Sequence, residues 1–570
     1  MVQPGLAVAP RRTPPVAPAG RAARELPLVL ILVALSLWVY RSALGAFFSP
    51  DDLIYLERVR GIVPEPPTLW RFLSGPAYFR LAHAAFGAHA FPYLLVNWLL
   101  HGLCVAALYA WVRGAGGGVL AAGLAAGLFG TSRLFLTVVL QVVTVAEPLS
   151  LLLALGALGM AVKPGAAWRL GAALVFAAAL LCKETVMLLP LLLLLPGPEA
   201  APLSARASRY AVLMAPTVLL LAYLSSPVVQ AGLFVNDIYA RAYGVNLFHN
   251  LMTMTGWATD FRTPIPDLYS TLSTAAWRTG LWVTLGFAAL AVVAWRATRL
   301  PAFGLGWWLL ALAPVLPLLR QRYLHYLYVP VAGLTLAVGA GWEWAVAGAR
   351  AAGAAVEPTA KRAAPAGGSR ATAGRSGVRA VFGWAVAVAA ILGQVVVSDA
   401  LIHERAAKRL PTVDLPYDPF LRKQETARRV ITRVGGATAG RRVSAVLVVP
   451  EQGWTAGLAQ ILHSVLGEGR ALRAVLPNLD SVALVPRWST AYRDFELFYG
   501  RVDGNVVDLG RGPDAHRRLV EALIADDCLP DAGQELATAL AAYPDDPGLA
   551  ALRDRLAAAA RRPPPAATRP

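Results

Sequence analysis

The chain has 570 residues, of which 57% are hydrophobic and only 15% are charged. Soluble domains carry about 25% charged residues, so this composition excludes a soluble globular protein, and its hydrophobicity excludes a disordered one. The formal net charge is +18. Such a charge is found in proteins that bind nucleic acid or acidic lipid, and in membrane proteins with basic loops. The position of the charges along the chain decides between these classes.

The N-terminus is rich in Pro and Arg up to Arg24, and an apolar run from 26 to 48 follows it. The apolar part of a cleaved signal peptide has about 7–15 residues, so we predict that this longer run is a retained first span. The three cysteines, Cys104, Cys182 and Cys528, indicate neither a disulfide framework nor a zinc site.

Apolar stretches of about 20 residues cross a bilayer as helices. The chain is therefore predicted to be an all-α polytopic membrane protein with about eleven spans, within a range of ten to twelve. The predicted spans are 26–48, 91–112, 118–138, 143–162, 167–182, 185–196, 209–225, 276–295, 301–319, 326–348 and 380–398. The stretch 185–196 is short, so 167–196 is alternatively one helix that is broken at Lys183 and Glu184.

The charged residues orient these spans. With the N-terminus inside, the cytoplasmic pieces carry 17 basic and three acidic residues, whereas the two large outer connectors, 49–90 and 226–279, carry seven of each. This is the positive-inside asymmetry of a cytoplasmic (inner) membrane protein. An odd number of spans then places the region after 399 outside. Short basic loops of this kind speak against nucleic acid as a partner.

The sequence divides into five regions. They are a basic cytoplasmic N-terminus (1–25), a transmembrane domain (26–398) with a cytoplasmic linker (349–380), an extracytoplasmic α/β region (399–512), a helical segment (513–560) and a disordered tail (561–570). The linker is read as a topology determinant, with a lipid-binding patch as the alternative.

The region after 399 has an ordinary soluble composition. Strands are predicted at 444–450 and 481–485, and a hairpin at 495–509 around Asp503 and Gly504. The helical segment resembles a single tetratricopeptide (TPR)-like helix pair. One such unit cannot bury its apolar face alone, so we expect it to pack on the α/β region.

Polar residues within the spans are costly and are candidates for function, and we add to them those at the span ends and in the first outer connector. Most lie toward the outer side, which predicts a polar cavity that opens outward. They are Asp51, Asp52, Arg80, Asn97, His101, Arg133, Glu147, Lys183, Glu184, Arg322 and Tyr323.

Each candidate has a structural alternative. The acidic pair Asp51–Asp52 could be a polar helix end at the water boundary, and Lys183 and Glu184 could form a local ion pair at a break in a helix. His101 shares a helix face with Asn97 and could be a hydrogen-bonded histidine between helices. The remaining candidates have similar alternatives: Glu147 at the outer interface, Arg133 in an internal salt bridge, and Tyr323 in an aromatic belt.

The order of these motifs resembles the GT-C membrane glycosyltransferases. The resemblance covers roughly 30–400 and rests on four segments: FFSPDDLIYL, NWLLH, LLCKETVMLLP and RQRYLHYLYVP. Within that superfamily the chain is similar to the protein O-mannosyltransferase-like and transmembrane TPR O-mannosyltransferase group. It departs from that group in having Thr131-Ser132-Arg133 where relatives often have His-Pro, and a single TPR-like unit.

The resemblance implies a polyprenyl-phosphate sugar as donor and transfer on the extracytoplasmic face. It implies Asp51 as the catalytic base, with Asp52 as the alternative. It also implies that Lys183, Arg322 and Arg80 contact the donor phosphate, with Asn97, His101, Arg133, Glu147, Glu184 and Tyr323 around the substrate cavity.

The residue types independently suit this chemistry. A sugar phosphate already carries a good leaving group, so the reaction needs a carboxylate to accept the proton of the acceptor hydroxyl and cations to stabilise the departing phosphate. No cofactor is firmly implied, and a divalent-metal contact through the acidic pair stays open.

The sequence therefore predicts a glycosyltransferase whose acceptor, a protein, lipid or glycan, is unknown. The alternatives are a transporter or flippase of a lipid-linked or anionic solute, and a non-catalytic membrane scaffold. A transporter often shows inverted repeats with polar groups at the midplane, which this sequence lacks.

Overall fold

The structure is a computed structural model, which describes most of the chain. The described residues are 18–66, 68–195, 202–227, 229, 240–259, 274–295, 298–355, 370–411, 413–450, 456–501 and 504–561. The predicted disordered tail and most of the basic N-terminus lie outside them.

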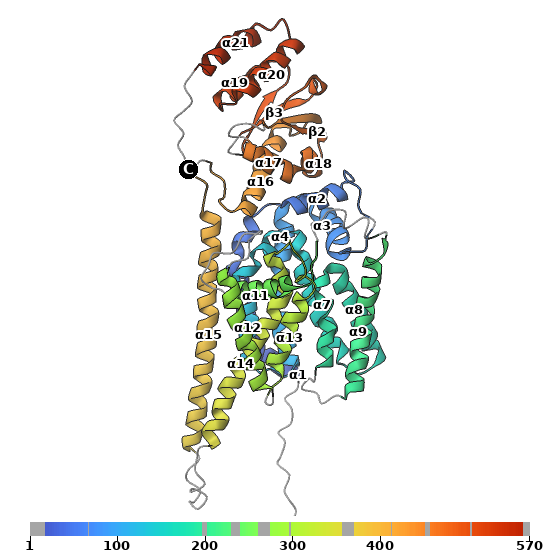
Figure 1. Cartoon of the computed structure of the whole chain (residues 1–570), viewed down its shortest axis with the longest axis vertical. Coiled ribbons are helices and arrows are strands. Elements are labelled where there is room, and N and C mark those ends of the chain that lie inside the picture. Colours follow the sequence, from blue (N-terminus) through green and yellow to red (C-terminus); the bar gives the residue numbers. More distant parts are fainter. Residues whose placement is uncertain are drawn as a thin grey trace, which may run out of the picture.

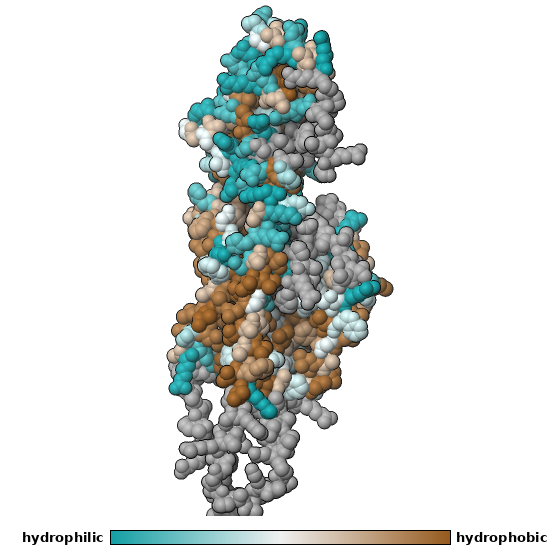
Figure 2. Space-filling view, turned by 90° about the vertical axis from the view of Figure 1, so that its left-hand side faces the viewer, coloured by the Kyte–Doolittle hydropathy of each residue, from teal (hydrophilic) through white to brown (hydrophobic). Residues whose placement is uncertain are grey.

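A bundle of apolar helices forms one part of the molecule, and a small α/β domain lies at one end of it (Figure 1). Hydrophobic residues gather on the surface of the bundle, whereas the α/β domain is mostly hydrophilic (Figure 2). The protein is thus a multi-pass membrane protein with one small domain outside the bilayer. The helices of the bundle are α1 (Pro18–Val39), α4 (Ala90–Gly114), α5 (Val119–Gly130), α6 (Leu136–Leu140), α7 (Ala146–Ala161), α8 (Ala166–Cys182), α9 (Leu203–Leu224), α11 (Val245–Thr259), α12 (Thr274–Ala294), α13 (Leu300–Leu312), α14 (Tyr328–Ala355) and α15 (Arg370–Ala407).

Among the described residues, six helices are long and apolar enough to cross a membrane, and a seventh span arises if α5 and the bent segment Arg133–Leu140 are counted together. Three apolar segments, at Ala166–Cys182, Glu184–Leu194 and Leu300–Leu312, are shorter. The count of eleven spans is therefore not confirmed. Prolines account for the short α13, because Pro314 and Pro317 lack the N–H that would continue a helix.

The predicted span 185–196 is not an α-helix. Helix α8 ends at Cys182, the backbone of Lys183 is extended, and two 3-10 helices follow, η5 (Glu184–Val186) and η6 (Leu189–Leu194). The alternative prediction of a break at Lys183 and Glu184 describes this segment better.

The predicted outer connector 226–279 is partly wrong. It contains α11, which packs along the start of α12 within the bundle. The two helices approach through Gly256 and Gly280, where any side chain would overlap the facing backbone. Buried polar residues on α11 made this segment look like a loop: Asn250 donates to the backbone oxygens of Leu316 and Leu318, so its polarity is satisfied internally.

The first connector, 49–90, contains α2 (Pro50–Val59) and α3 (Tyr78–Phe86). Both helices lie at the end of the bundle that carries the α/β domain (Figure 1). The described ends of the linker predicted at 349–380 are helical, since α14 extends to Ala355 and α15 begins at Arg370, at the opposite end of the bundle. The connector and the C-terminal domain thus share one side, as expected.

The α/β domain is built on a four-stranded sheet of order β2-β1-β3-β4. Its strands are β1 (Val443–Val448), β2 (Leu479–Val485), β3 (Glu496–Gly500) and β4 (Val506–Gly510). Strand β1 pairs in parallel with β2 and β3, and β3 pairs antiparallel with β4. The predicted strands are confirmed, although Asp503 of the predicted hairpin lies outside the described residues.

Helices cover both faces of this sheet. On one face lie α16 (Pro419–Ala437), α17 (Ala456–Leu466) and α18 (Arg470–Val475), and on the other α19 (Gly512–Ala525), α20 (Leu529–Ala542) and α21 (Pro547–Ala560). The alternation along β1 explains both layers, because Ala445 and Leu447 face the first set and Val446 and Val448 the second. The C-terminal segment is thus three helices, and the predicted TPR-like pair is not confirmed.

The first face of the domain shares its core with the membrane part. Leu53 and Leu56 of α2 and Phe79 of α3 belong to the same buried cluster as Val430 of α16 and Leu472 of α18. Connector and domain are therefore one packed unit, and this unit positions the cavity described next.

Candidate active site

A cavity of about 510 Å³ lies where the bundle, the first connector and α16 meet. Its walls come from α2, from the segment 70–75, from the junction between α6 and α7, from the end of α8, from the segment 321–326, and from the end of α15 with the start of α16. Elements from the whole length of the chain thus enclose one polar space. The charged side chains that line it are Asp51, Arg58, Arg71, Lys183, Arg405 and Lys423.

Asp51 is the one acidic residue among the described residues that line this cavity. It lies in the first turn of α2, where the helix dipole favours a carboxylate. Ile54, Tyr55 and Arg58 line the same cavity, and this spacing of three, four and seven residues is one face of a helix. Desolvation raises the pKa of Asp51, and the positive charges of Lys423 and Arg71 act against that shift.

Asp52 does not line the cavity and has a structural role instead. It is fully buried and forms a capping box with Ser49, because its Oδ2 accepts the Ser49 N–H at 2.7 Å and its own N–H donates to Ser49 Oγ at 3.4 Å. Its Oδ1 accepts the backbone N–H of Val143 at 2.7 Å. Burial raises the pKa of Asp52 to about 7, although these hydrogen bonds oppose the rise. The pattern Ser49-x-x-Asp52 predicts such a box from sequence.

Lys183 reaches the cavity because α8 stops there. Its Nζ lies 3.1 Å from Glu147 Oε1, and both side chains are buried. The ammonium group also lies 5.3 Å from the centre of the Tyr326 ring. Glu147 thus partners Lys183 from the first turn of α7, and the local ion pair between Lys183 and Glu184 is not what the structure contains.

Glu184 is held by the first connector. Arg71 binds both of its carboxylate oxygens, with Nε 3.0 Å from Oε2, and the Trp70 indole N–H donates to Oε2 at 3.2 Å. Arg71 has a φ of 54°, a left-handed backbone that non-glycine residues rarely adopt. Sequence reasoning missed Arg71, since an arginine in a long connector carries no signal of its own.

Residues at the end of α15 and in the first turns of α16 also line the cavity. Arg405 at the end of α15 binds the Asp418 carboxylate, and Asp418 caps α16 by accepting the N–H groups of Phe420 and Leu421 at 2.9 Å. This cap fixes the first turn of α16 and with it Lys423, which lines the cavity. Sequence analysis assigned these residues to a separate domain and therefore missed them.

Tyr323 lines the cavity as predicted, stacked on His325 with ring centres 5.1 Å apart. Its neighbour Arg322 does not appear in the lining, and the Arg322 guanidinium donates to the Leu319 carbonyl at 3.2 Å. Arg80 is also elsewhere, on the surface of α3, where it pairs with Glu65. The structure therefore brings only Lys183 of the three predicted phosphate contacts to the cavity.

Asn97, His101 and Arg133 are buried beside the cavity rather than in its wall. The Asn97 amide donates to the Gln141 carbonyl at 2.5 Å, where α6 ends. His101 lies 2.9 Å from the Tyr328 hydroxyl and 3.0 Å from the Gly130 carbonyl. These contacts match the structural alternative stated for His101.

Within the described ranges, no three His, Cys, Asp or Glu side chains are grouped as metal ligands. The acidic pair diverges, since both oxygens of Asp52 accept backbone N–H groups while Asp51 faces the cavity. The two carboxylates therefore do not converge on one ion.

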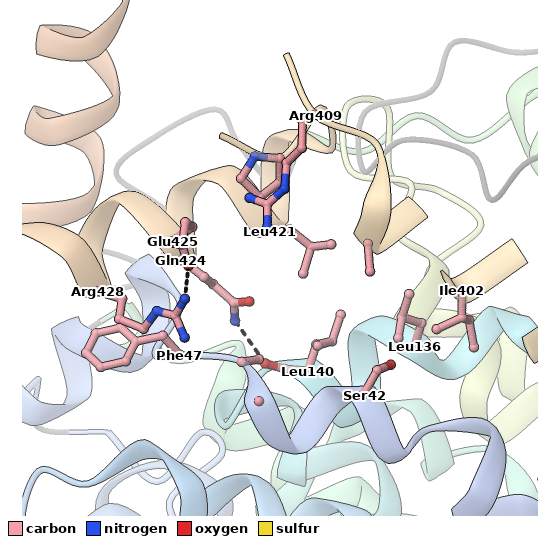
Figure 3. A pocket seen from close by; sticks show the side chains of 14 residues that line it. Ser42, Phe47, Leu136, Leu140, Ile402, Arg409, Leu421, Gln424, Glu425 and Arg428 are labelled. Carbon is pink, nitrogen blue, oxygen red and sulfur yellow. Dashed lines mark hydrogen bonds and ion pairs between the residues drawn. The ribbon is translucent and has the colours of Figure 1, made fainter. Parts of the chain in front are cut away.

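A second, smaller cavity of about 200 Å³ lies on the other side of α16 (Figure 3). Leu136, Leu140 and Ile402 form part of its apolar wall, and the Gln424 amide donates to the Leu140 carbonyl at 3.0 Å. Helix α16 thus separates two cavities, with Lys423 on one side and Gln424 on the other.

Comparisons with known proteins give a distant structural likeness only. No family model and no curated protein matches the sequence. A crystal structure of ArnT from Cupriavidus metallidurans in the apo state has 15% identity and a TM-score of 0.41, with 81% of this chain and 86% of that chain covered. A crystal structure of the same protein bound to undecaprenyl phosphate has 14% identity and a TM-score of 0.35, with 82% of this chain and 90% of that chain covered. These values are too low to establish a shared family or activity.

Proposed function

We propose that the protein is an integral-membrane glycosyltransferase of the GT-C type. It transfers a sugar from a polyprenyl-phosphate donor to an acceptor hydroxyl on the extracytoplasmic face of the cytoplasmic membrane, with the N-terminus inside and the α/β domain outside. The observation that carries this proposal is the cavity at the end of the bundle, in which Asp51, the one carboxylate among the described residues of the lining, faces several cations.

Asp51 is the general base in this proposal. Its carboxylate accepts the proton of the acceptor hydroxyl while the hydroxyl oxygen forms a bond to the anomeric carbon of the donor sugar. The bond between that carbon and the phosphate oxygen breaks, and the polyprenyl phosphate leaves with the electron pair. The Asp51 position suits this role because its carboxyl, unlike that of Asp52, is not occupied by backbone N–H groups.

Lys183 and Arg71 stabilise the leaving phosphate in the same proposal. Both line the cavity: Lys183 follows the end of α8 in the bundle, and Arg71 of the first connector binds Glu184, the next residue along the chain. Their partners, the buried Glu147 and the half-buried Glu184, hold them in place. Fixed cations in a site that excludes bulk water stabilise developing negative charge more than mobile ones do. Arg80 and Arg322, which lie outside the lining, take no part.

Transfer of radiolabelled sugars from polyprenyl-phosphate donors tests the proposal, with the full-length protein in membranes. We expect Asp51→Asn to reduce transfer by about 100-fold or more, in the range lost when a general base is removed. Glu65→Gln is the matched control, because it removes a carboxylate from the same connector outside this cavity. Full activity of Asp51→Asn would overturn the assignment of the base.

The orientation is tested separately. A reporter fused to the C-terminus should be active only on the extracytoplasmic side, and a cytoplasmic signal would contradict the proposed topology. Flux of a lipid-linked solute in vesicles, with no transfer from any donor, would favour the transporter over the enzyme.

A further inference from the structure

We infer that Arg58 and Lys423 form an anion-binding subsite that holds a carboxylate or phosphate group of the acceptor. The inference rests on the proposed glycosyl transfer and names the chemical class of its acceptor: a hydroxyl compound with a negative charge a few atoms away from the reacting oxygen.

Three of the five lining cations already have a partner. Arg71 binds Glu184, Lys183 lies against Glu147, and Arg405 binds Asp418. Glu147 is fully buried, Glu184 is half-buried, and Asp418 caps α16. Each of these three cations is therefore held in place by a carboxylate of the protein before any substrate enters.

Arg58 and Lys423 differ from the other three. Neither forms an ion pair with a carboxylate of the described residues, although the Lys423 charge acts on Asp51. The Nε of Arg58 is buried and has no hydrogen-bond partner among the described residues. A buried donor without a partner is costly, and an anionic ligand would remove that cost. Glu57, the neighbour of Arg58, is bound by Arg470 of the α/β domain.

The Arg58 side chain is held in place on the cavity wall. Its guanidinium lies over the Tyr55 ring at 5.0 Å, and Tyr55 stacks on Phe79 with ring centres 4.7 Å apart. Tyr55 in turn fills the space in front of Gly75, where a side chain would collide with it. A guanidinium supported in this way offers a planar set of donors that suits a carboxylate or a phosphate.

The position of the two cations assigns the anion to the acceptor. Helices α2 and α16 belong to the connector and the C-terminal domain, outside the bundle, so their side chains meet a substrate that arrives from the aqueous side (Figure 1). Lys183, which follows the end of α8, and Arg71, which binds the adjacent Glu184, lie against the bundle instead. On an ideal helix, seven residues separate Asp51 and Arg58 by about 10 Å along the axis. The anion is thus held away from the hydroxyl that Asp51 deprotonates.

The test uses matched neutral and anionic probes with the full-length protein in lipid nanodiscs. The carboxylate pair is methyl β-glucoside and methyl β-glucuronide, and the phosphate pair is glucose and glucose 6-phosphate. We expect the wild type to bind at least one anionic probe about tenfold more tightly than its neutral counterpart, as measured by isothermal titration without donor. Equal binding of the anionic and neutral probes in both pairs would overturn the inference.

Variants then identify the residues. Arg58→Met and Lys423→Met should each lower the affinity for the anionic probe about tenfold and leave the neutral probe unchanged, and Arg58→Lys and Lys423→Arg should restore part of it. Binding of polyprenyl phosphate should not change in the two methionine variants. If the methionine variants instead bind polyprenyl phosphate more weakly than the wild type does, the subsite holds the anion of the donor and not that of the acceptor. Because binding is measured without donor, the result stands apart from the transfer assay, in which absence of any transfer by the wild type would refute the proposed function.

Discussion

The Asp52 carboxylate accepts the backbone N–H of Val143 at 2.7 Å, and this bond joins α2 to the segment that opens α7. The second oxygen of the same carboxylate accepts the Ser49 N–H at 2.7 Å. Asp52 therefore orients the whole of α2, and with it the cavity face on which Asp51 lies. Asp51 faces the cavity, whereas the adjacent Asp52 fixes the position of the helix that carries both residues.

Asp52→Ala should destabilise the protein by about 1–3 kcal/mol, because it leaves two buried N–H groups without an acceptor. Asp51→Ala is the control and should change stability by less than about 1 kcal/mol, since it removes only a favourable charge near a helix N-terminus. Thermal unfolding in detergent measures both. Equal losses in the two variants would contradict the division of roles.

Asp52 should also make the stability depend on pH. Burial raises its pKa to about 7 from the ordinary value of 3.8. Between these values the folded protein keeps the proton that the unfolded chain has released, so the unfolded state binds fewer protons. The contribution of this group to the free energy of unfolding is therefore present below about pH 4 and is lost as the pH rises toward 7. Unfolding temperatures measured over this range should depend less on pH in Asp52→Asn.

The pH dependence of transfer should report Asp51. Desolvation raises the pKa of this carboxyl above its ordinary value of 3.8, and the charges of Lys423 and Arg71 limit the rise. Because a base must be ionised, activity should increase with pH through this elevated pKa. Lys423→Gln should move the acidic limb to higher pH, and Lys423→Arg should leave it close to the wild-type position. Identical profiles in Lys423→Gln and the wild type would refute the electrostatic link.

The pair of Lys183 and Glu147 should show strong coupling. Glu147→Gln leaves a buried ammonium group without its counter-charge, which costs about 3–5 kcal/mol. The double variant Glu147→Gln with Lys183→Met should recover much of this stability, because no buried charge then remains unpaired. Thermal unfolding of the wild type, both single variants and the double variant completes the cycle. Additive losses would mean that the two side chains act independently.

Gly280→Ala should disrupt the contact between α11 and α12, because the added methyl group would overlap the Met252 backbone. We expect a loss of about 1–3 kcal/mol, in the range of overpacked sites. Gly286 lies on the same helix, and a side chain there would meet nothing within 4 Å. Gly286→Ala should therefore be tolerated, and comparable losses in both variants would show that the close approach is unimportant.

Local patterns in the sequence were sufficient for much of the fold. Long apolar runs predicted most helices of the bundle, and short valine-rich apolar runs predicted the strands, because each of these signals lies within a few neighbouring residues. The break at Lys183 was left as an alternative, since a run of leucines at 188–195 resembles a span whether its backbone is α-helical or 3-10. Helix α11 was missed because its polar residues find their partners far away in the chain.

The candidate site was predicted in part. Asp51, Lys183 and Tyr323 line the cavity, and these residues stood out because they are polar near the ends of apolar runs. Arg71 and Lys423 could not be found in this way. Each lies in a hydrophilic stretch, where a basic residue is ordinary, and only the packing of the connector against α16 gives it a neighbour in the cavity.

The shared core of α2, α3 and the α/β domain sets an order for the assembly of this protein. Leu53 and Leu56 are synthesised early. Their buried neighbours Val430 and Leu472 are synthesised only after the last helix of the bundle. Until then the connector leaves the membrane with its apolar face uncovered. A chain that stops after α15 would therefore insert all its spans and yet leave the apolar face of α2 uncovered. The first connector is thus synthesised early, but its apolar face is buried only after the α/β domain has been made.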